Sequence, residues 1–245
     1  MSKTCIIIPC FNEFTRIKTE EFVKCIRCNN YIDFLFVNDG STDLTLQKLQ
    51  ELKNTCSDRI EIISNNQNLG KAESIRVGVL IVNNQIKYDY IGYWDADLST
   101  PLDEIEYFIN AIKTNKLLII GSRFKRVGSS INRKWYRHVL GRIFSTFASL
   151  ILKLPIYDTQ CGAKLFKAEL ADCFKKPFIT KWLFDIEIIA RMQQRYKKSD
   201  LINNIYELPL NSWHDVSGSK LRLKHIVWVP FQLILIYYKY KKNDY

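Results

Sequence analysis

The sequence predicts an α/β fold with an open, mostly parallel β-sheet flanked by helices and one ligand site. Three observations support this prediction. Short apolar runs alternate with helical patterns through the first half of the 245-residue chain, as they do in proteins with parallel sheets. A cluster of polar residues follows each of the first four runs. Two aspartates, Asp95 and Asp97, stand at the end of the fourth run.

Each apolar run has the length of a buried strand. The runs cover residues 5–9, 32–38, 59–64, 88–95 and 117–122. The segments between them show the apolar spacing of helices, near residues 15–28, 43–54, 70–84 and 101–114. A chain of this length can bury a sizeable core, so the alternation predicts one main domain.

The polar clusters predict where a ligand binds. In chain order they read PCFNE, NDGSTD, NNQNLGKAES and DADLST. Because the carboxyl ends of parallel strands meet at one edge of a sheet, we expect these four loops to converge there. That edge is the predicted ligand site.

The pair of Asp95 and Asp97 indicates a cation. Two carboxylates at the end of a buried strand repel each other and are costly to desolvate unless a cation offsets their charge. Carboxylate oxygens suit Mg²⁺ or Mn²⁺ bridging a diphosphate. Lys71, expected at a helix start, also favours an anion there. The chain has neither a GxxxxGK[ST] nor a GxGxxG motif, which disfavours a P-loop ATPase and a Rossmann dehydrogenase.

The positive charge of the chain indicates an anionic partner. The formal net charge is +11, and the span between Glu106 and Asp158 contains ten basic residues and no acidic one. Within it, residues 134–153 mix arginines with aromatic and aliphatic residues at helical spacing. This pattern predicts an amphipathic helix at a membrane interface. It disfavours a nucleic-acid partner, because base-stacking aromatics beside exposed lysines are not the pattern here.

The C-terminal residues repeat this pattern. An apolar stretch over residues 226–238 is flanked by basic residues. It predicts a membrane-docking segment at 221–245 after a catalytic domain at 1–220, and the alternative is a helix packed on the protein's own core or on a second copy. No apolar run reaches the roughly 18–20 residues of a spanning helix. Seven cysteines without a disulfide or zinc framework suggest a reducing compartment. We therefore expect a peripheral protein on the cytoplasmic face of a membrane.

Several motifs together resemble a known family. IIIPCFNE, FVNDGSTD, NLGKAESIRVG, DADLSTP and GSRF, in this order and spacing, resemble family-2 glycosyltransferases with the Rossmann-like GT-A fold. Farther along, YDTQCGAKLF, WLFDIEIIA and WHDVSGSKL resemble the dolichyl-phosphate β-glucosyltransferases and their bacterial polyprenyl-phosphate relatives. The resemblance extends from about residue 3 to about residue 225.

The resemblance implies a nucleotide-sugar donor held by the four loops. The implied donor residues are Pro9, Phe11, Glu13, Asp39, Lys71, Asp95, Ala96 and Asp97. Asp95 and Asp97 would hold Mg²⁺ or Mn²⁺ on the diphosphate, and Arg76 would lie near the donor. Phe11 replaces a tyrosine that is usual before NE, which removes a hydroxyl contact. Ser99 stands where the related mannosyltransferases often have a glutamine, which weakens the mannosyl interpretation.

The resemblance also implies an acceptor site. The acceptor phosphate would meet Arg123, Arg137, Arg142 and Lys220. Asp158, Gln160 and Cys161 would form the floor of the site, with Asp185 and Glu187 on a helix facing it. The residues expected to carry catalysis are Asp97, Arg123, Arg137, Asp158 and Asp185. For His214, a substrate contact, a metal ligand and an ordinary loop residue all remain open.

These observations together predict an inverting glycosyltransferase. It would move a hexose, in first place glucose from UDP-glucose, to a polyprenyl or dolichyl phosphate and give a β-linked product. One alternative is a GDP-mannose-dependent enzyme, and another is transfer to a glycan hydroxyl. A hydroxyl acceptor needs a general base, for which Asp158, Asp185 and Glu187 are the candidates. A lipid phosphate arrives ionised and needs cations instead.

Overall fold

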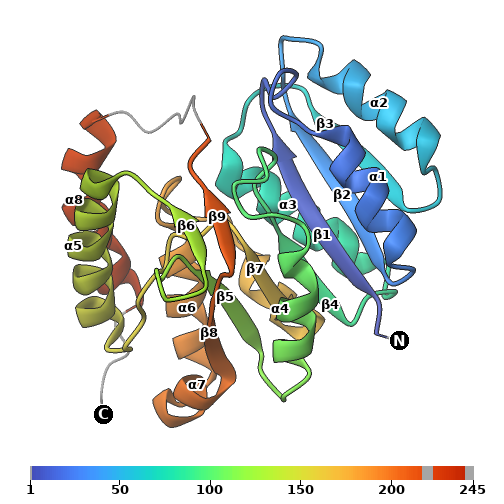
Figure 1. Ribbon diagram of the computed structural model, residues 1–245. Coiled ribbons are helices and arrows are strands. Elements are labelled where there is room, and N and C mark those ends of the chain that lie inside the picture. Colours follow the sequence, from blue (N-terminus) through green and yellow to red (C-terminus); the bar gives the residue numbers. More distant parts are fainter. Residues whose placement is uncertain (1, 217–222, 241–245) are drawn as a thin grey trace.

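A seven-stranded sheet forms the centre of the protein, with the strand order β3-β2-β1-β4-β7-β5-β8 (Figure 1). The computed structural model describes residues 2–216 and 223–240, and in the second stretch it describes side chains from Trp228 onward. The predicted α/β class and mostly parallel sheet are confirmed.

The first half of the chain alternates strands and helices, and all five predicted strands are present. The strands are β1 (Thr4–Cys10), β2 (Ile32–Asp39), β3 (Ile60–Asn65), β4 (Tyr90–Tyr93) and β5 (Leu118–Ser122). The helices between them are α1 (Thr19–Cys28), α2 (Thr45–Thr55), α3 (Lys71–Asn84) and α4 (Glu104–Ile112). β1 pairs in parallel with both β2 and β4, and β2 pairs in parallel with β3.

The second half completes the sheet with an inserted antiparallel strand. β7 (Lys164–Lys167) lies antiparallel between β4 and β5, and β8 (Ile205–Pro209) extends the sheet parallel to β5. Two short strands, β6 (Ser130–Asn132) and β9 (Ser212–His214), pair separately. The remaining elements are helices: α5 (Trp135–Leu152), the 3₁₀ helix η1 (Ala168–Phe174), α6 (Phe184–Arg195), α7 (Lys198–Asn204) and α8 (Leu223–Tyr240).

The sheet is buried on both faces. In β1, Ile6 and Ile8 point into one core and Ile7 into the other, and all three are 0% exposed. Helices α1, α2 and α4 cover the first face, and α3, α5, α6 and α8 contribute to the core on the second. Strands buried on both sides read as continuous apolar runs, which is why their positions could be predicted.

Helices α5 and α8 lie side by side at one end of the molecule (Figure 1). Leu233 and Ile236 of α8 are buried in the core, and the Tyr240 hydroxyl donates a 2.7 Å hydrogen bond to Glu187 of α6. The opposite faces of both helices carry exposed apolar side chains: Trp135, Tyr136, Val139, Leu140, Ile143, Phe147, Leu150, Trp228, Phe231, Ile234, Leu235 and Tyr238. Within the residues described, no helix combines the length and apolarity needed to cross a bilayer.

Candidate functional site

The four polar loops lie at the carboxyl edge of neighbouring strands, as predicted. Asp39, the last residue of β2, is buried and accepts hydrogen bonds from the Asn65 side chain and from the backbone N–H groups of Leu69 and Gly70, at 2.8–2.9 Å. It thereby fixes the loop that leads into α3. The neighbouring Gly40 has φ +65°, and a Cβ atom there would overlap the backbone of this loop. Asp39 and Gly40 therefore fix where Lys71 begins α3.

The loop after β1 reaches the aspartate pair. Pro9 and Phe11 are partly buried, whereas Glu13 is buried and its carboxylate accepts hydrogen bonds from the Arg16 guanidinium. Nη1 of the same guanidinium is 3.8 Å from Oδ2 of Asp97. The first and fourth loops are therefore linked through Arg16, a residue that sequence analysis did not single out.

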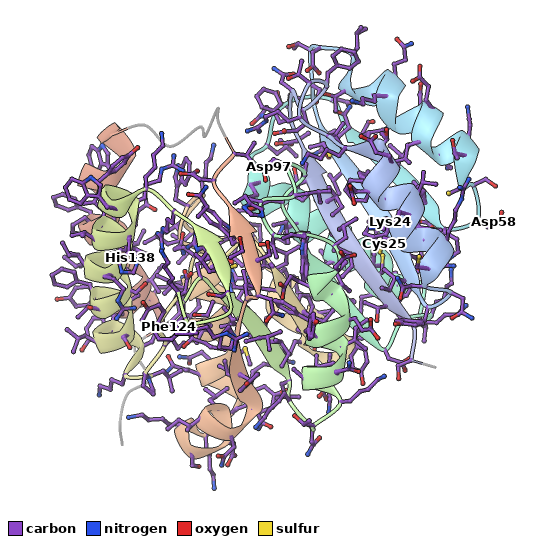
Figure 2. All side chains as sticks on the ribbon, in the orientation of Figure 1. Lys24, Cys25, Asp58, Asp97, Phe124 and His138 are labelled. Atoms are coloured by element: carbon purple, nitrogen blue, oxygen red, sulfur yellow. The ribbon has the colours of Figure 1, made fainter. Side chains whose placement is uncertain are left out.

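The loop after β4 is held in a defined turn. The indole N–H of Trp94 donates to the Thr100 carbonyl at 3.1 Å, and the Asp97 carboxylate accepts the Ser99 N–H at 3.1 Å. Ala96 is buried, and Leu98 has φ +52°, a conformation that is costly for a branched side chain and recurs at functional sites. The turn leaves Asp95 and Asp97 partly exposed at the sheet edge. Figure 2 shows Asp97 beside β9, consistent with the 2.9 Å hydrogen bond from the His214 N–H to the Ser99 carbonyl.

Lys71 and the aspartate pair form one electrostatic unit. Nζ of Lys71 lies 2.5 Å from Oδ1 of Asp95. Burial would raise the pKa of Asp95, but the charge and hydrogen bond of Lys71, together with the charges of Arg123 and Lys164, lower the pKa below its ordinary value. For Asp97, burial and the charge of Asp95 both act to raise the pKa. Asp97 is therefore the carboxylate whose charge is less well compensated.

The segment 158–162 lies directly against Asp95. A Cβ atom on Gly162 would overlap Oδ2 of Asp95 and come within 2.9 Å of Oδ1. Only a glycine leaves room for the carboxylate here. In the same segment Cys161 is buried, and the side-chain nitrogen of Gln160 is buried without a hydrogen-bond partner in the described structure. The segment expected to form the floor of the site thus borders the aspartate pair.

Arg123 and Asp158 form a buried ion pair beside this segment. Nε and Nη2 of Arg123 each donate a 2.7 Å hydrogen bond to the Asp158 carboxylate. The guanidinium carbon also lies 5.4 Å from the ring centre of Trp213. Burial would raise the pKa of Asp158, but Arg123 lowers it to about 2. The charge of Arg123 also lowers the pKa of Asp95, which is evidence that the two sites are close.

The other predicted acceptor arginines lie on α5. Arg137 donates to Asp215 at 2.6 Å, and Arg142 donates to the Tyr157 carbonyl at 2.8 Å while its guanidinium lies 3.7 Å from the Tyr157 ring centre. Lys220 falls outside the described residues. The structure thus brings three of the four predicted cations to the segments around residues 157–158 and 213–215.

Asp185 and Glu187 are both buried and ion-paired. Asp185 accepts hydrogen bonds from Lys164 at 2.6 Å and from the Tyr93 hydroxyl at 2.5 Å. Glu187 is 0% exposed and accepts from Arg191, from the backbone of Ile179 and from the Tyr240 hydroxyl of α8. Glu187 thus holds elements of the fold together, whereas Asp185 contacts Tyr93, the last residue of β4.

Two further residues, Arg76 and His214, make contacts within the protein. Arg76 pairs with Glu73 and donates to the carbonyls of Phe174 and Lys175, so it links α3 to η1. His214 has an exposed ring whose Nε2 lies 3.0 Å from the Ser212 hydroxyl.

A metal bound at this edge would have few protein ligands. Among the described residues, no group of three or more His, Cys, Asp or Glu side chains could hold a metal ion. Asp95 and Asp97 supply carboxylate oxygens of the kind that Mg²⁺ and Mn²⁺ prefer, and the raised pKa of Asp97 marks an uncompensated charge. The donor set fits a divalent cation that completes its coordination with substrate oxygens and water.

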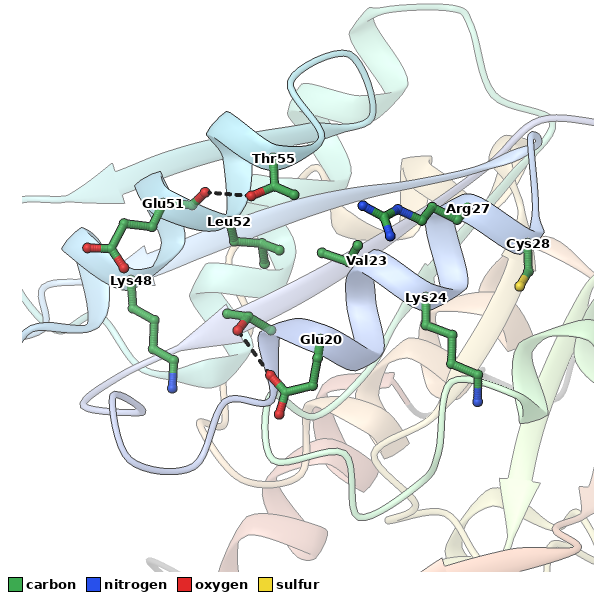
Figure 3. A pocket seen from close by; sticks show the side chains of 10 residues that line it. Glu20, Val23, Lys24, Arg27, Cys28, Lys48, Glu51, Leu52 and Thr55 are labelled. Atoms are coloured by element: carbon green, nitrogen blue, oxygen red, sulfur yellow. Dashed lines mark hydrogen bonds between the residues drawn. The ribbon is translucent and has the colours of Figure 1, made fainter.

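A separate groove of about 580 Å³ lies between α1 and α2 (Figure 3). Its lining runs from Thr19 to Cys28 on α1 and from Lys48 to Thr55 on α2. Its charged side chains have both signs, as on a solvated helix surface: Glu20, Lys24, Arg27, Lys48 and Glu51. It contains none of the predicted site residues, and we place the candidate site at the sheet edge.

Sequence analysis missed several residues of the site. Lys164 is 1% exposed within a short apolar strand, where a lysine is unexpected. Asp215 directly follows β9 and pairs with Arg137; it lies within the WHDVSGSKL motif, but the motif did not single it out. The basic run did contain Arg133, although nothing in the pattern distinguished it from its neighbours.

Comparisons with known proteins agree with this geometry. The family model Glycosyl transferase family 2 matches residues 5–174. A dolichyl-phosphate β-glucosyltransferase of Saccharomyces cerevisiae is 32% identical over 89% of this chain and 69% of its own length. An uncharacterised protein of Methanocaldococcus jannaschii is 28% identical over 93% of this chain and 96% of its own.

A solved structure supports the fold. Glucosyl-3-phosphoglycerate synthase from Mycobacterium tuberculosis, in complex with Mn²⁺, UDP and glucosyl-3-phosphoglycerate, has a TM-score of 0.70 over 98% of this chain and 80% of that chain. At 15% identity this likeness is evidence for the fold alone. The family match extends over most of the sheet and the aspartate pair, and with the 32% identical relative it establishes that the chain belongs to glycosyl transferase family 2.

Proposed function

We propose that the protein transfers glucose from UDP-glucose to a polyprenyl phosphate such as dolichyl phosphate. The relatives described as dolichyl-phosphate β-glucosyltransferases support this acceptor and this sugar. A single displacement at the anomeric carbon inverts an α-linked donor, so the product is β-linked. The electrons of the breaking bond move to the departing UDP, and an oxygen of the lipid phosphate forms the new bond.

The donor lies at the carboxyl edge of β1, β2 and β4. Glu13 and Asp39 face the nucleoside, with Pro9, Phe11 and Ala96 lining its path to the aspartate pair. Lys71 starts α3 beside Asp95 and offsets negative charge at the diphosphate. Asp95 and Asp97 would hold Mg²⁺ or Mn²⁺, which would stabilise the charge that develops on the leaving diphosphate.

The observation that favours a phosphate over a hydroxyl acceptor is that all three candidate general bases are ion-paired. Asp158 is neutralised by Arg123, Asp185 by Lys164 and Glu187 by Arg191. Each carboxylate is buried and already accepts hydrogen bonds, so none is poised to take a proton from a hydroxyl. A lipid phosphate has a second pKa of roughly 6 and needs no base. The cations Arg123, Arg137 and Arg142 position that phosphate.

A membrane surface presents such an acceptor. Exposed apolar side chains lie on α5 and α8, among them Phe147 and Trp228, and basic residues adjoin both helices in the sequence. A bilayer interface buries such side chains. We propose that α5 and the segment 221–245 dock the catalytic domain, residues 1–220, on the cytoplasmic side of a membrane.

Nucleotide release from a donor panel tests this function. The protein is mixed with Mg²⁺ or Mn²⁺ and UDP-glucose, UDP-galactose, UDP-GlcNAc or GDP-mannose, each with and without a short-chain polyprenyl phosphate. Lipid-dependent release of UDP from UDP-glucose is expected. Release only from GDP-mannose would instead support a mannosyltransferase, and release without the lipid phosphate would support another acceptor.

A further inference from the structure

Arg133 differs from the other arginines of the basic segment. Five arginines lie within residues 123–142, and four have a polar partner in the described part of the chain: Arg123, Arg126, Arg137 and Arg142. Arg133, between β6 and α5, is partly buried and makes no hydrogen bond or ion pair within the described residues. A guanidinium withdrawn from water without a partner is costly, so such a group is expected to have an anionic ligand.

Helix α5 is shaped to hold this guanidinium. A Cβ atom on Gly141 would overlap Nη2 of Arg133 and lie 3.3 Å from its Cζ. Gly141 therefore leaves a notch in the helix surface that the Arg133 side chain fills. A glycine inside a helix is less stabilising than an alanine, and its contact with Arg133 explains why a glycine stands here.

Both a cation and a carboxylate act on Arg133. Burial lowers the pKa of Arg133 to about 10, with the charge of Arg123 acting in the same direction and Asp158 opposing it. Asp158 is already held by both ends of Arg123. Arg142 stacks on Tyr157, which also lies near Arg133. Glu207 lies near Arg142, and its carboxylate accepts hydrogen bonds from the backbone N–H groups of Tyr157 and Asp158. The nearby carboxylates Asp158 and Glu207 are therefore held by other donors, and neither hydrogen-bonds Arg133 in the described part of the chain.

We infer that Arg133 binds the phosphate group of the lipid acceptor directly, and that Gly141 positions it to do so. This inference rests on the proposed function, because the lipid phosphate that Arg133 would bind is the acceptor of that function. Arg123 and Arg142 have polar partners within the protein, whereas Arg133 supplies donors that the described part of the chain does not otherwise use. A planar guanidinium can give two parallel hydrogen bonds to a phosphate.

The diphosphate of the sugar donor is the other anion that Arg133 could bind. The test therefore compares binding of the lipid phosphate with binding of UDP. Calorimetry measures binding of a short-chain polyprenyl phosphate and, separately, of UDP with Mn²⁺. The proteins are the wild type, Arg133→Ala, Arg133→Lys, Gly141→Ala and, as a control, Lys125→Ala, which removes an exposed cation of the same segment. We expect Arg133→Ala to weaken lipid-phosphate binding by at least about tenfold, because a charge-assisted contact is lost, and to change UDP binding less than about twofold.

Each outcome decides the inference. Gly141→Ala should weaken lipid-phosphate binding in the same way, Arg133→Lys should restore part of it, and Lys125→Ala should leave it unchanged. The melting temperature of Arg133→Ala should not fall, because no ion pair is broken. Equal lipid-phosphate binding by wild type and Arg133→Ala overturns the inference, as does a loss of UDP binding alone. A wild type that binds the lipid phosphate through Arg133 but transfers no sugar would overturn the proposed function and leave the phosphate site standing.

Discussion

Arg123 binds both carboxylate oxygens of Asp158 with two parallel hydrogen bonds of 2.7 Å, and its backbone N–H donates a third of 3.1 Å to the same group. The pair joins the end of β5 to the segment between α5 and β7, which lies against Asp95 at Gly162. One ion pair thus connects the predicted acceptor cations to the aspartate pair. Because Asp158 is buried and only 13% of the Arg123 side chain is exposed, their interaction is little weakened by solvent.

The first prediction concerns stability against pH. The pKa of Asp158 is lowered to about 2 in the folded protein, where burial is outweighed by Arg123, and an unfolded chain has an aspartate pKa of about 3.9. A lowered carboxylate pKa stabilises the fold above the unfolded value, and this contribution disappears as the pH falls through the folded value. The difference in unfolding free energy between wild type and Asp158→Asn should therefore be largest above about pH 4 and shrink toward about pH 2. Urea titrations at several pH values measure it, and a difference independent of pH would contradict the assignment.

The second prediction uses the contact between Gly162 and Asp95. In Gly162→Ala the new methyl group displaces the Asp95 carboxylate, so transfer activity should fall by about 100-fold or more, as expected when a group at the diphosphate is misplaced. The control is Gly128→Ala, where φ is +85° and a Cβ atom would meet nothing within 4 Å, so that this variant tests backbone strain without a displaced side chain. The transfer rates of both variants are measured, and their melting temperatures verify that they are folded. Full activity in Gly162→Ala would show that the carboxylate position does not matter.

The third prediction concerns the buried pair of Lys164 and Asp185. Lys164→Met leaves the Asp185 carboxylate buried without its cation and should destabilise the protein by about 3–5 kcal/mol. Adding Asp185→Asn should recover part of this loss, since the unpaired charge is then removed. Urea unfolding of both variants gives the comparison. Because Asp185 is not a general base in the proposed reaction, Asp185→Asn should also have a pH–rate profile of the same shape as the wild type. If the fall in rate at acidic pH were lost in Asp185→Asn, a hydroxyl acceptor would be supported instead.

The sequence was sufficient for the first half of the fold, because each strand there is buried on both faces and therefore reads as one apolar run. The position of the site could be predicted for the same reason. Parallel strands end at one edge of the sheet, and Asp39, Lys71 and Asp95 each lie at or shortly after the end of a strand. β7 could not be predicted, because four residues that include the buried Lys164 have no strand period. Pairing between distant segments, such as Arg137 with Asp215, depends on tertiary structure and has no local signal.

The fourth prediction concerns the metal. With only two carboxylates at the described site, the free protein should bind Mn²⁺ weakly, and UDP should tighten binding because its diphosphate adds oxygen ligands. Calorimetry with and without UDP measures this difference. EDTA should abolish transfer by the wild type, and added Mn²⁺ or Mg²⁺ should restore it. With the metal added, the transfer activity of Asp97→Asn should stay about 100-fold or more below that of the wild type. Tight Mn²⁺ binding in the absence of UDP would contradict a site that the substrate completes.

The last prediction concerns the apolar face of α5 and α8. Phe147 and Trp228 are 56% and 60% exposed, and a bilayer interface that buries them gains about 1.5–3 kcal/mol for each large apolar side chain. Phe147→Glu and Trp228→Glu should therefore each weaken sedimentation with anionic vesicles by about tenfold or more, since a carboxylate is also repelled by the lipid headgroups. Leu44→Glu is the matched control, because Leu44 is 55% exposed but lies before α2, away from the α5 and α8 end of the molecule. An equal loss of vesicle binding in all three variants would indicate a general charge effect. Loss of vesicle binding in Phe147→Glu and Trp228→Glu alone would locate the membrane contact on this face. If these two variants still transfer sugar to a short-chain acceptor in solution, docking is separate from catalysis.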